Sequence, residues 1–156
     1  MKKLVLFCFM VLLFSTIYGE NKIYKGSIAS SNNIISIIEN NKIYNGSIVT
    51  SNKIAGVISN GKLYEGPIET SNKLALIVKN GKIYSKMESS SNIIATINNG
   101  KIYSGSVVTS NKIIGIIKPD KIYEGPIETS NKILISFKEE LTDTEVAAIL
   151  YFLGYI

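Results

Sequence analysis

The sequence has no histidine, no tryptophan and no arginine, and its only cysteine, Cys8, lies near the N-terminus. A single cysteine excludes an intramolecular disulfide. Without histidine, and without cysteine after residue 8, the chain lacks the commonest general base, the thiol nucleophile and the preferred zinc ligands. It has no G-x-S-x-G motif, and aspartate-rich calcium loops are missing because Asp120 and Asp143 are the only aspartates. We predict a protein that is not an enzyme and that uses no metal or cofactor.

Concentrated charge of one sign is also missing. After residue 19 the chain has 15 lysines and 12 acidic residues, and nearly every unit of the sequence carries its lysines at the same two positions. Nucleic-acid-binding proteins concentrate positive charge on one face and favour arginine for phosphate contacts. We therefore expect no nucleic-acid partner, and we interpret the lysines as solubilising charge at strand ends.

Residues 1–19 have the order of a secretory signal peptide. Lys2 and Lys3 precede an apolar run over residues 4–14, and a short tract of mostly small residues ends at Gly19. An uncleaved membrane anchor is the alternative, but a run of about 11 apolar residues is shorter than the ~20 that a spanning helix needs. We expect cleavage near Gly19, a secreted, periplasmic or cell-surface location, and no integral membrane span in the remaining chain.

The pattern that dominates the rest of the chain is a repeat of 20 residues, with one step of 19. The repeated tyrosines are Tyr24, Tyr44, Tyr64, Tyr84, Tyr103 and Tyr123. An asparagine follows eight residues after each of them. A fixed period of this length indicates units that bury their apolar surface by stacking on their neighbours. We assign residues 20–138 to a domain of six such units and residues 139–156 to a separate C-terminal segment.

Each unit contains two turn signals. Asn-Gly at residues 60–61, 80–81 and 99–100 lies between β-rich runs and favours a two-residue hairpin. Thr-Ser-Asn, as at residues 50–52, marks the second turn. Alternation places apolar residues on both faces, so the sheet should close on itself or stack on another. We predict an all-β fold of tandem hairpin repeats, an antiparallel meander curled into a barrel, prism or fan; a β-solenoid is the alternative.

The fourth unit departs from the pattern. Lys86 replaces the usual glycine, Glu88 replaces an apolar residue, and one residue is missing between Asn92 and Tyr103. A deletion inside a strand would swap its two faces, so we expect the deletion in the turn around residues 98–100. This unit should mark a seam, a bulge or an exposed edge.

The C-terminal segment has its own signal. Thr142 and Glu145 have the spacing of a capping box, which predicts a helix that ends at Gly154. Its apolar residues run all round the helix, which argues for burial as a cap over the open end of the repeat stack. The alternative is contact with a membrane or a partner. The residues of that contact would be Leu150, Tyr151, Phe152, Leu153 and Tyr155.

The tyrosines are the only set of residues with binding potential, because spaced aromatic rings can stack on sugars. Packing against neighbouring repeats explains the same recurrence, and we favour that role. The stretches Lys62–Gly66 and Ser71–Ala75 resemble a group of bacterial exported proteins with tandem ~20-residue K-I-Y-x-G…S-N-x-I-A units. They are also similar to MORN repeats and to the choline-binding repeats of cell walls.

The resemblance implies a repeat scaffold without an activity. We predict a secreted, non-enzymatic β-repeat protein that acts as a surface or protein-interaction module. Its partner would be an unknown protein or a cell-envelope glycan, and exposed strand edges would allow self-association. The alternative function is a carbohydrate- or cell-wall-binding module that uses the tyrosine face.

Overall fold

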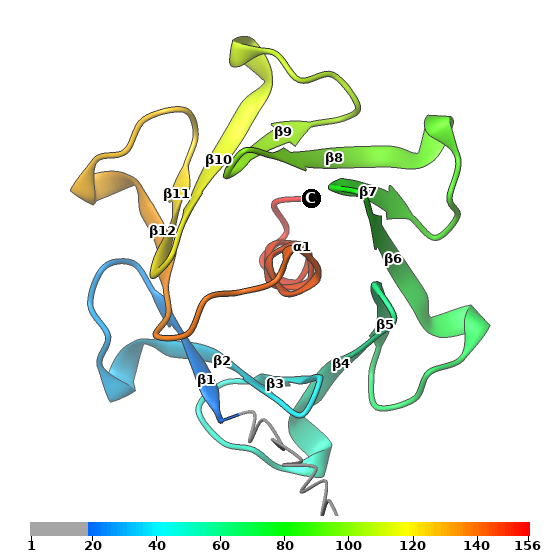
Figure 1. The fold of residues 1–156 in the computed structure, drawn as a ribbon. Helices are drawn as coiled ribbons and strands as arrows, with labels where there is room; N and C mark the ends of the chain where they lie inside the picture. Colours follow the sequence, from blue (N-terminus) through cyan, green and yellow to red (C-terminus); the bar gives the residue numbers. More distant parts are fainter. Residues whose placement is uncertain (1–18) are drawn as a thin grey trace, which may run out of the picture.

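A computed structural model describes residues 19–156, so residues 1–18 of the predicted leader lie outside the described residues. Within residues 19–156, twelve strands and six 3₁₀ turns are followed by one α-helix, α1 (Asp143–Phe152) (Figure 1). The strands are β1 Asn21–Lys25, β2 Ile34–Glu39, β3 Lys42–Asn45, β4 Ile54–Ser59, β5 Lys62–Glu65, β6 Leu74–Lys79, β7 Lys82–Ser85, β8 Ile93–Asn98, β9 Lys101–Ser104, β10 Ile113–Lys118, β11 Lys121–Glu124 and β12 Ile133–Ser136.

The sheet is a closed barrel. Each strand pairs with its neighbours in the sequence, and β1 pairs with β12, with Tyr24 opposite Ser136 and Lys25 opposite Ile135. Every pairing is antiparallel, which confirms the meander of hairpin repeats and rules out the parallel stacking of a β-solenoid. Because the ring is closed, none of the twelve described strands offers a free edge for self-association.

Two-residue turns join the two strands of each hairpin. In the turn between β6 and β7, Asn80 has a φ of 51° and Gly81 a φ of 71°, and Lys79 pairs with Lys82 across it. Positive φ at both turn residues matches the right-handed twist of the flanking strands, and asparagine and glycine adopt it at the lowest steric cost. The predicted Asn-Gly hairpins are therefore confirmed.

The inner face of the barrel is a ring of aliphatic side chains, one from each odd-numbered strand. This inner ring consists of Ile23, Ile43, Leu63, Ile83, Ile102 and Ile122. These side chains are 0–1 % exposed. Since side chains alternate along a strand, each neighbouring tyrosine lies on the outer face.

A second layer of the inner face varies in size around the barrel. Its residues, paired across from the inner ring, are Ser36, Gly56, Leu76, Ala95, Gly115 and Ile135. Units three apart match: Gly56 corresponds to Gly115, and Leu76 to Ile135. The six units therefore form two similar sets of three, units 1–3 and units 4–6.

The helix α1 fills the barrel. Figure 1 looks down its axis and shows it at the centre of the ring. A closed sheet of about eight strands can be filled by its own side chains, and diameter grows with strand number, so a ring of twelve strands needs an inserted element. Val146, Ala147, Ala148, Ile149 and Leu150 are 0–3 % exposed, as expected for a helix that is apolar all round. The helix therefore occupies the lumen rather than the expected position over the open end.

The predicted capping box is confirmed at the start of this helix. The Thr142 side chain accepts a hydrogen bond from the Glu145 backbone N–H (3.3 Å), and the Glu145 carboxylate accepts one from the Thr142 N–H (2.8 Å). Gly154 follows the helix with a φ of 74°. These contacts satisfy backbone groups that the helix ends would otherwise leave unpaired.

The expected position of the deletion in the fourth unit was wrong. The turn between β8 and β9 keeps its two residues, whereas only four residues separate β7 from its 3₁₀ turn at Ser90. The equivalent connection in the third unit, from Glu65 to Ser71, has five. A deletion there leaves the register of the sheet unchanged, because the connection lies outside the strands. Lys86, with a φ of 61°, makes the bend that glycine makes elsewhere.

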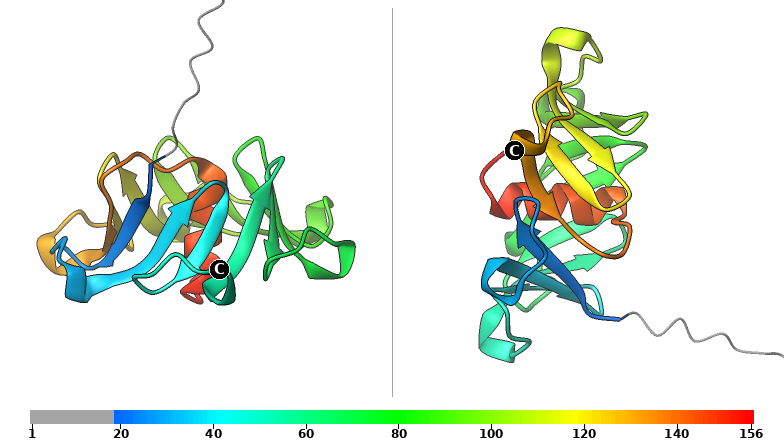
Figure 2. Two further views of the ribbon diagram at one scale, coloured as in Figure 1. Left: turned by 90° about the horizontal axis from the view of Figure 1, so that it is seen from below. Right: turned by 90° about the vertical axis from the view of Figure 1, so that its left-hand side faces the viewer.

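The two ends of the barrel differ. The connections between odd- and even-numbered strands all leave one end and spread outward, while the tight turns lie at the other end (Figure 2). We call these connections petals 1 to 6, and the ends the petal end and the turn end. The petals are residues 26–33, 46–53, 66–73, 86–92, 105–112 and 125–132. The last residues of α1 lie at the petal end (Figure 2).

Candidate interaction surface

The tyrosine ladder lies on the outer face of the barrel, but it is not an open row of rings. Tyr24, Tyr44, Tyr84 and Tyr103 are 5–9 % exposed, and Tyr64 and Tyr123 are half-buried. Each ring lies next to an outward residue of an adjacent strand. These partners are Ser136, Ile37, Val57, Ile77, Thr96 and Ile116, in the order of the tyrosines. The rings thus pack on the sheet, which leaves little of their faces for stacking on a sugar.

The exposed apolar residues lie in the petals instead. Each petal presents one at the same place, three residues before the start of its 3₁₀ turn. These petal tips are Ile28, Ile48, Ile68, Met87, Val107 and Ile127. They are 55–66 % exposed. The one sequence signal for them is an aliphatic residue recurring among glycine, proline, serine and threonine, where a solvent-exposed loop would otherwise be polar.

Hydrogen bonds within each petal hold the chain in a defined shape. In petal 2 the Thr50 hydroxyl donates to the Asn52 side-chain oxygen at 2.7 Å, and petals 3, 5 and 6 repeat this bond. In petals 1 and 4 an asparagine amide instead donates to the carbonyl of the petal tip, from Asn33 to Ile28 (3.2 Å) and from Asn92 to Met87 (3.3 Å). The repeated asparagine thus has a structural role in petals 2, 3, 5 and 6, and the asparagine that ends the 3₁₀ turn has one in petals 1 and 4.

Charge distinguishes petals 2 and 5 from petals 3 and 6, whereas petals 1 and 4 have no net charge. Petals 2 and 5 each contain one lysine, Lys53 or Lys112, and no acidic residue. Petals 3 and 6 each contain one lysine and one glutamate, and a second glutamate ends the strand before them, so these positions have a net charge of −1. The four carboxylates are Glu65, Glu69, Glu124 and Glu128. All four are exposed.

Two ion pairs fasten petals to the barrel. Lys79, at the end of β6, contacts Glu88 of petal 4 at 2.7 Å, and Lys118, at the end of β10, contacts Glu128 of petal 6 at 2.8 Å. The hydrogen bond to Glu88 raises the pKa of Lys79 above its ordinary value. These groups are solvent-exposed, so each pair adds little to stability and mainly orients its petal.

The tail residues assigned to a membrane or partner contact have mixed positions. Leu150 is buried in the barrel, Tyr151 and Phe152 are half-buried, and Leu153 and Tyr155 are 37 % and 40 % exposed at the petal end. The Tyr151 hydroxyl donates a hydrogen bond to the Glu65 carboxylate. That bond, and then burial, raise the pKa of Tyr151.

Tyr155 lies close enough to Glu124 to be influenced by its charge, whereas Tyr151 donates a hydrogen bond to Glu65. Burial, followed by the negative charge of Glu124, raises the pKa of Tyr155. Glu65 and Glu124 occupy the same position in units 3 and 6. The two tail tyrosines therefore lie near equivalent glutamates of the two matching sets of three units.

A comparison with protein-family models agrees with this architecture. The model described as "6-fold beta flower protein" matches residues 23–150, from the first strand into the central helix. The chain belongs to this family. Searches among curated proteins and among solved structures found no significant match. The family accounts for the regular strand repeats, and gives no support to a likeness to MORN or choline-binding repeats.

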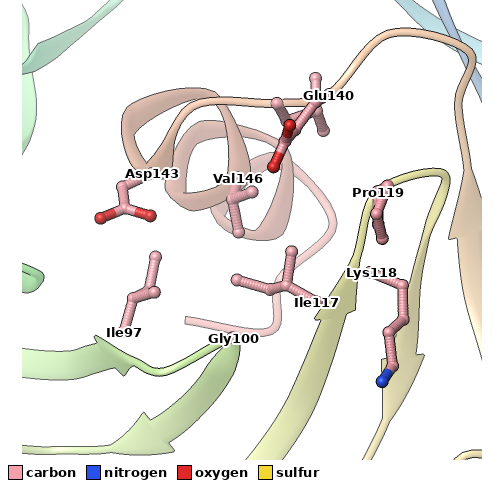
Figure 3. A pocket seen from close by; sticks show the side chains of 9 residues that line it. Ile97, Gly100, Ile117, Lys118, Pro119, Glu140, Asp143 and Val146 are labelled. Atoms are coloured by element: carbon pink, nitrogen blue, oxygen red, sulfur yellow. The ribbon is translucent and has the colours of Figure 1, made fainter.

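The turn end of this β-flower has a cavity of about 250 Å³ beside the start of α1 (Figure 3). Glu140 and Asp143 lie on its helix side, and Ile97 and Ile117 face them from the barrel. The Lys118 ammonium extends away from both carboxylates in Figure 3. Both acidic residues are exposed.

The rest of the described β-flower offers little metal-binding chemistry. Among residues 19–156, no three histidine, cysteine, aspartate or glutamate side chains are grouped so that they could hold a metal ion. In the same residues, no helix has the length and apolar character needed to cross a membrane. Packing within the folded chain does not explain the exposed aliphatic side chains at the petal end.

Proposed function

We propose that this β-flower is an exported, non-enzymatic module that binds a protein partner through its petal end. The observation that carries the proposal is the set of six petal tips, which are 55–66 % exposed. Scattered exposed apolar residues are ordinary, but a ring at one end of a molecule is typical of an interaction surface. Buried packing explains the tyrosines, so we do not extend the proposal to glycans.

Export is part of the proposal and rests on the charged, apolar and small-residue order of residues 1–19. The intact mass of the protein collected outside the cytoplasm tests it. A chain that begins at Glu20 is expected, and a chain that retains residues 1–19 in the membrane fraction contradicts cleavage.

The binding surface is tested by photo-crosslinking in cells that make the protein. A photoreactive residue is placed singly at Ile48 or Ile127, at the petal end, and at Lys82 or Lys101, at the turn end. All four positions are exposed, so the replacements should leave the fold intact. Discrete crosslinked species are expected from the petal positions alone. The same yield from both ends, or no species from the petal positions, contradicts the proposal.

A further inference from the structure

The large exposed apolar residues of the described chain share one end of the barrel. They are the six petal tips with Val108, Leu153 and Tyr155. The chain that follows α1 and includes Leu153 and Tyr155 emerges at the petal end, inside the ring of petals (Figures 1 and 2). This end therefore presents a broad face with an apolar centre and an apolar rim.

The charges on this face follow the two matching sets of three units. Going round the barrel, petals 2 and 5 carry a positive charge, and petals 3 and 6 a net negative one. A basic petal is thus directly followed by an acidic petal twice in each turn, on opposite sides of the ring. When a second copy is turned over onto this face, its acidic petals can lie opposite the basic petals of the first copy.

The match follows from symmetry. Two identical faces related by a twofold axis meet with their petals in reverse order. If the axis passes between petals 2 and 3, petal 2 of each copy meets petal 3 of the other, petal 5 meets petal 6, and petal 1 meets petal 4. Petal 2, with Lys53, then faces petal 3 of the partner copy, with Glu69. Petal 5, with Lys112, faces petal 6, where Glu128 also contacts Lys118 of its own chain at 2.8 Å.

Resting on the proposed function, we infer that the partner at the petal end is a second copy of this chain, in a face-to-face twofold dimer. The apolar side chains supply the buried surface, and the alternating petals set its rotation. A lipid surface fits less well. Anionic headgroups would repel petals 3 and 6, whose glutamates are Glu65, Glu69, Glu124 and Glu128.

Sedimentation of the chain from residue 20 tests the dimer, with two charge-reversed variants. The first, Lys53→Glu with Lys112→Glu, makes all four of these petals acidic. The second, Glu69→Lys with Glu128→Lys, makes all four basic. Each variant alone is expected to sediment as a monomer at about 100 μM, where the unchanged chain is a dimer, with a dissociation constant raised at least about tenfold. An equimolar mixture is expected to recover the dimer, because it restores opposite charges at every contact.

A control variant, Lys82→Glu with Lys101→Glu, has the same change in net charge at the turn end. It should dimerise as the unchanged chain does. Glu128→Lys also removes the ion pair with Lys118, but that pair is exposed and circular dichroism will show whether the fold is retained.

The outcomes separate the two proposals. An unchanged chain that is monomeric at all concentrations overturns the dimer, as does a dimer that both petal variants leave intact. If that monomer binds vesicles of phosphatidylglycerol and phosphatidylcholine, the petal end is a lipid surface and the dimer is overturned as well. Petal-end crosslinks of a mass other than twice the monomer keep the proposed function and overturn the dimer. No petal-end crosslinks at all overturn both.

Discussion

The inner ring and the petal tips are both sets of six apolar residues in the same sixfold arrangement, yet the inner ring is buried and the petal tips are exposed. Ile83 in β7 is 0 % exposed, whereas Ile68, at the tip of petal 3, is 62 % exposed. In most units the two positions are only five residues apart. The inner ring recurs because the barrel needs a core. The petal tips recur although nothing in the fold buries them. Their recurrence therefore points to a role in contacts with another molecule rather than in folding.

The largest expected effect comes from truncating one side chain of the inner ring and, in a separate variant, one petal tip. Ile83→Ala should lower the free energy of unfolding by about 2–5 kcal/mol, because it leaves a cavity between the sheet and α1. Ile68→Ala should change it by less than about 0.5 kcal/mol, because its side chain is mostly in water. Urea denaturation followed by circular dichroism measures both. Similar losses in the two variants would show that the petals belong to the folding core.

A second test concerns how tightly the helix segment packs against the second layer of the inner face. A Cβ atom at Gly56 would lie 2.8 Å from the Tyr64 carbonyl oxygen and 2.9 Å from Cζ of Phe152. Gly56→Ala should therefore cost about 1–3 kcal/mol of unfolding free energy, since both neighbours must move. Phe152→Leu in the same background should recover part of the loss in urea denaturation.

The matching position in the other set of three units supplies the control. At Gly115 an added Cβ would meet Cδ1 of Ile102 at 3.0 Å and the Tyr123 carbonyl oxygen at 3.1 Å, and its three nearest atoms all belong to the sheet. Gly115→Ala should cost less than Gly56→Ala, and Phe152→Leu should not rescue it. A loss at Gly115 equal to that at Gly56 would argue that the sheet alone limits these positions.

The sequence was sufficient for the parts of this fold that local chemistry determines. The Asn-Gly turns specify two-residue hairpins, and the alternation of aliphatic and tyrosine positions, as at Leu63 and Tyr64, specifies two apolar faces. The spacing of Thr142 and Glu145 specifies a helix start. The closed ring and α1 cover the inner face, and most of the outward tyrosines are buried. Each of these features depends on residues a few positions apart.

The parts that were missed depend on the closed ring as a whole. The width of the lumen follows from strand number and tilt, so the place of α1 inside it could not be read from the helix itself. The shortened petal 4 was misplaced because the same gap between tyrosines fits a shorter turn or a shorter petal. The exposure of Ile28 and its equivalents was missed because alternation gives no face to a residue outside a strand.

The smallest expected effect comes from a contact between the central helix and the base of petal 3. Tyr151, at the end of the central helix, donates a hydrogen bond to Glu65, which ends β5 at the base of petal 3. The bond requires a protonated tyrosine, and it raises the pKa of Tyr151 above the ordinary value of 10.0. Its contribution to stability is therefore fully present below about pH 10 and is lost as the pH rises through the higher pKa of the folded state.

Tyr151→Phe should make the fall in unfolding free energy with rising pH less steep. Urea denaturation at pH 8, 10 and 11, values chosen on either side of a tyrosine pKa of about 10, should show the unfolding free energy of the unchanged chain falling more steeply than that of the variant. Glu65→Gln keeps the Tyr151 hydroxyl but removes the negative charge beside it, so its slope should lie between the two. Lysine titration affects all three proteins alike and cancels in the comparison. Equal slopes would mean that the helix end and the petal base are not coupled through this bond, and that the inner ring holds the helix without help from the petal end.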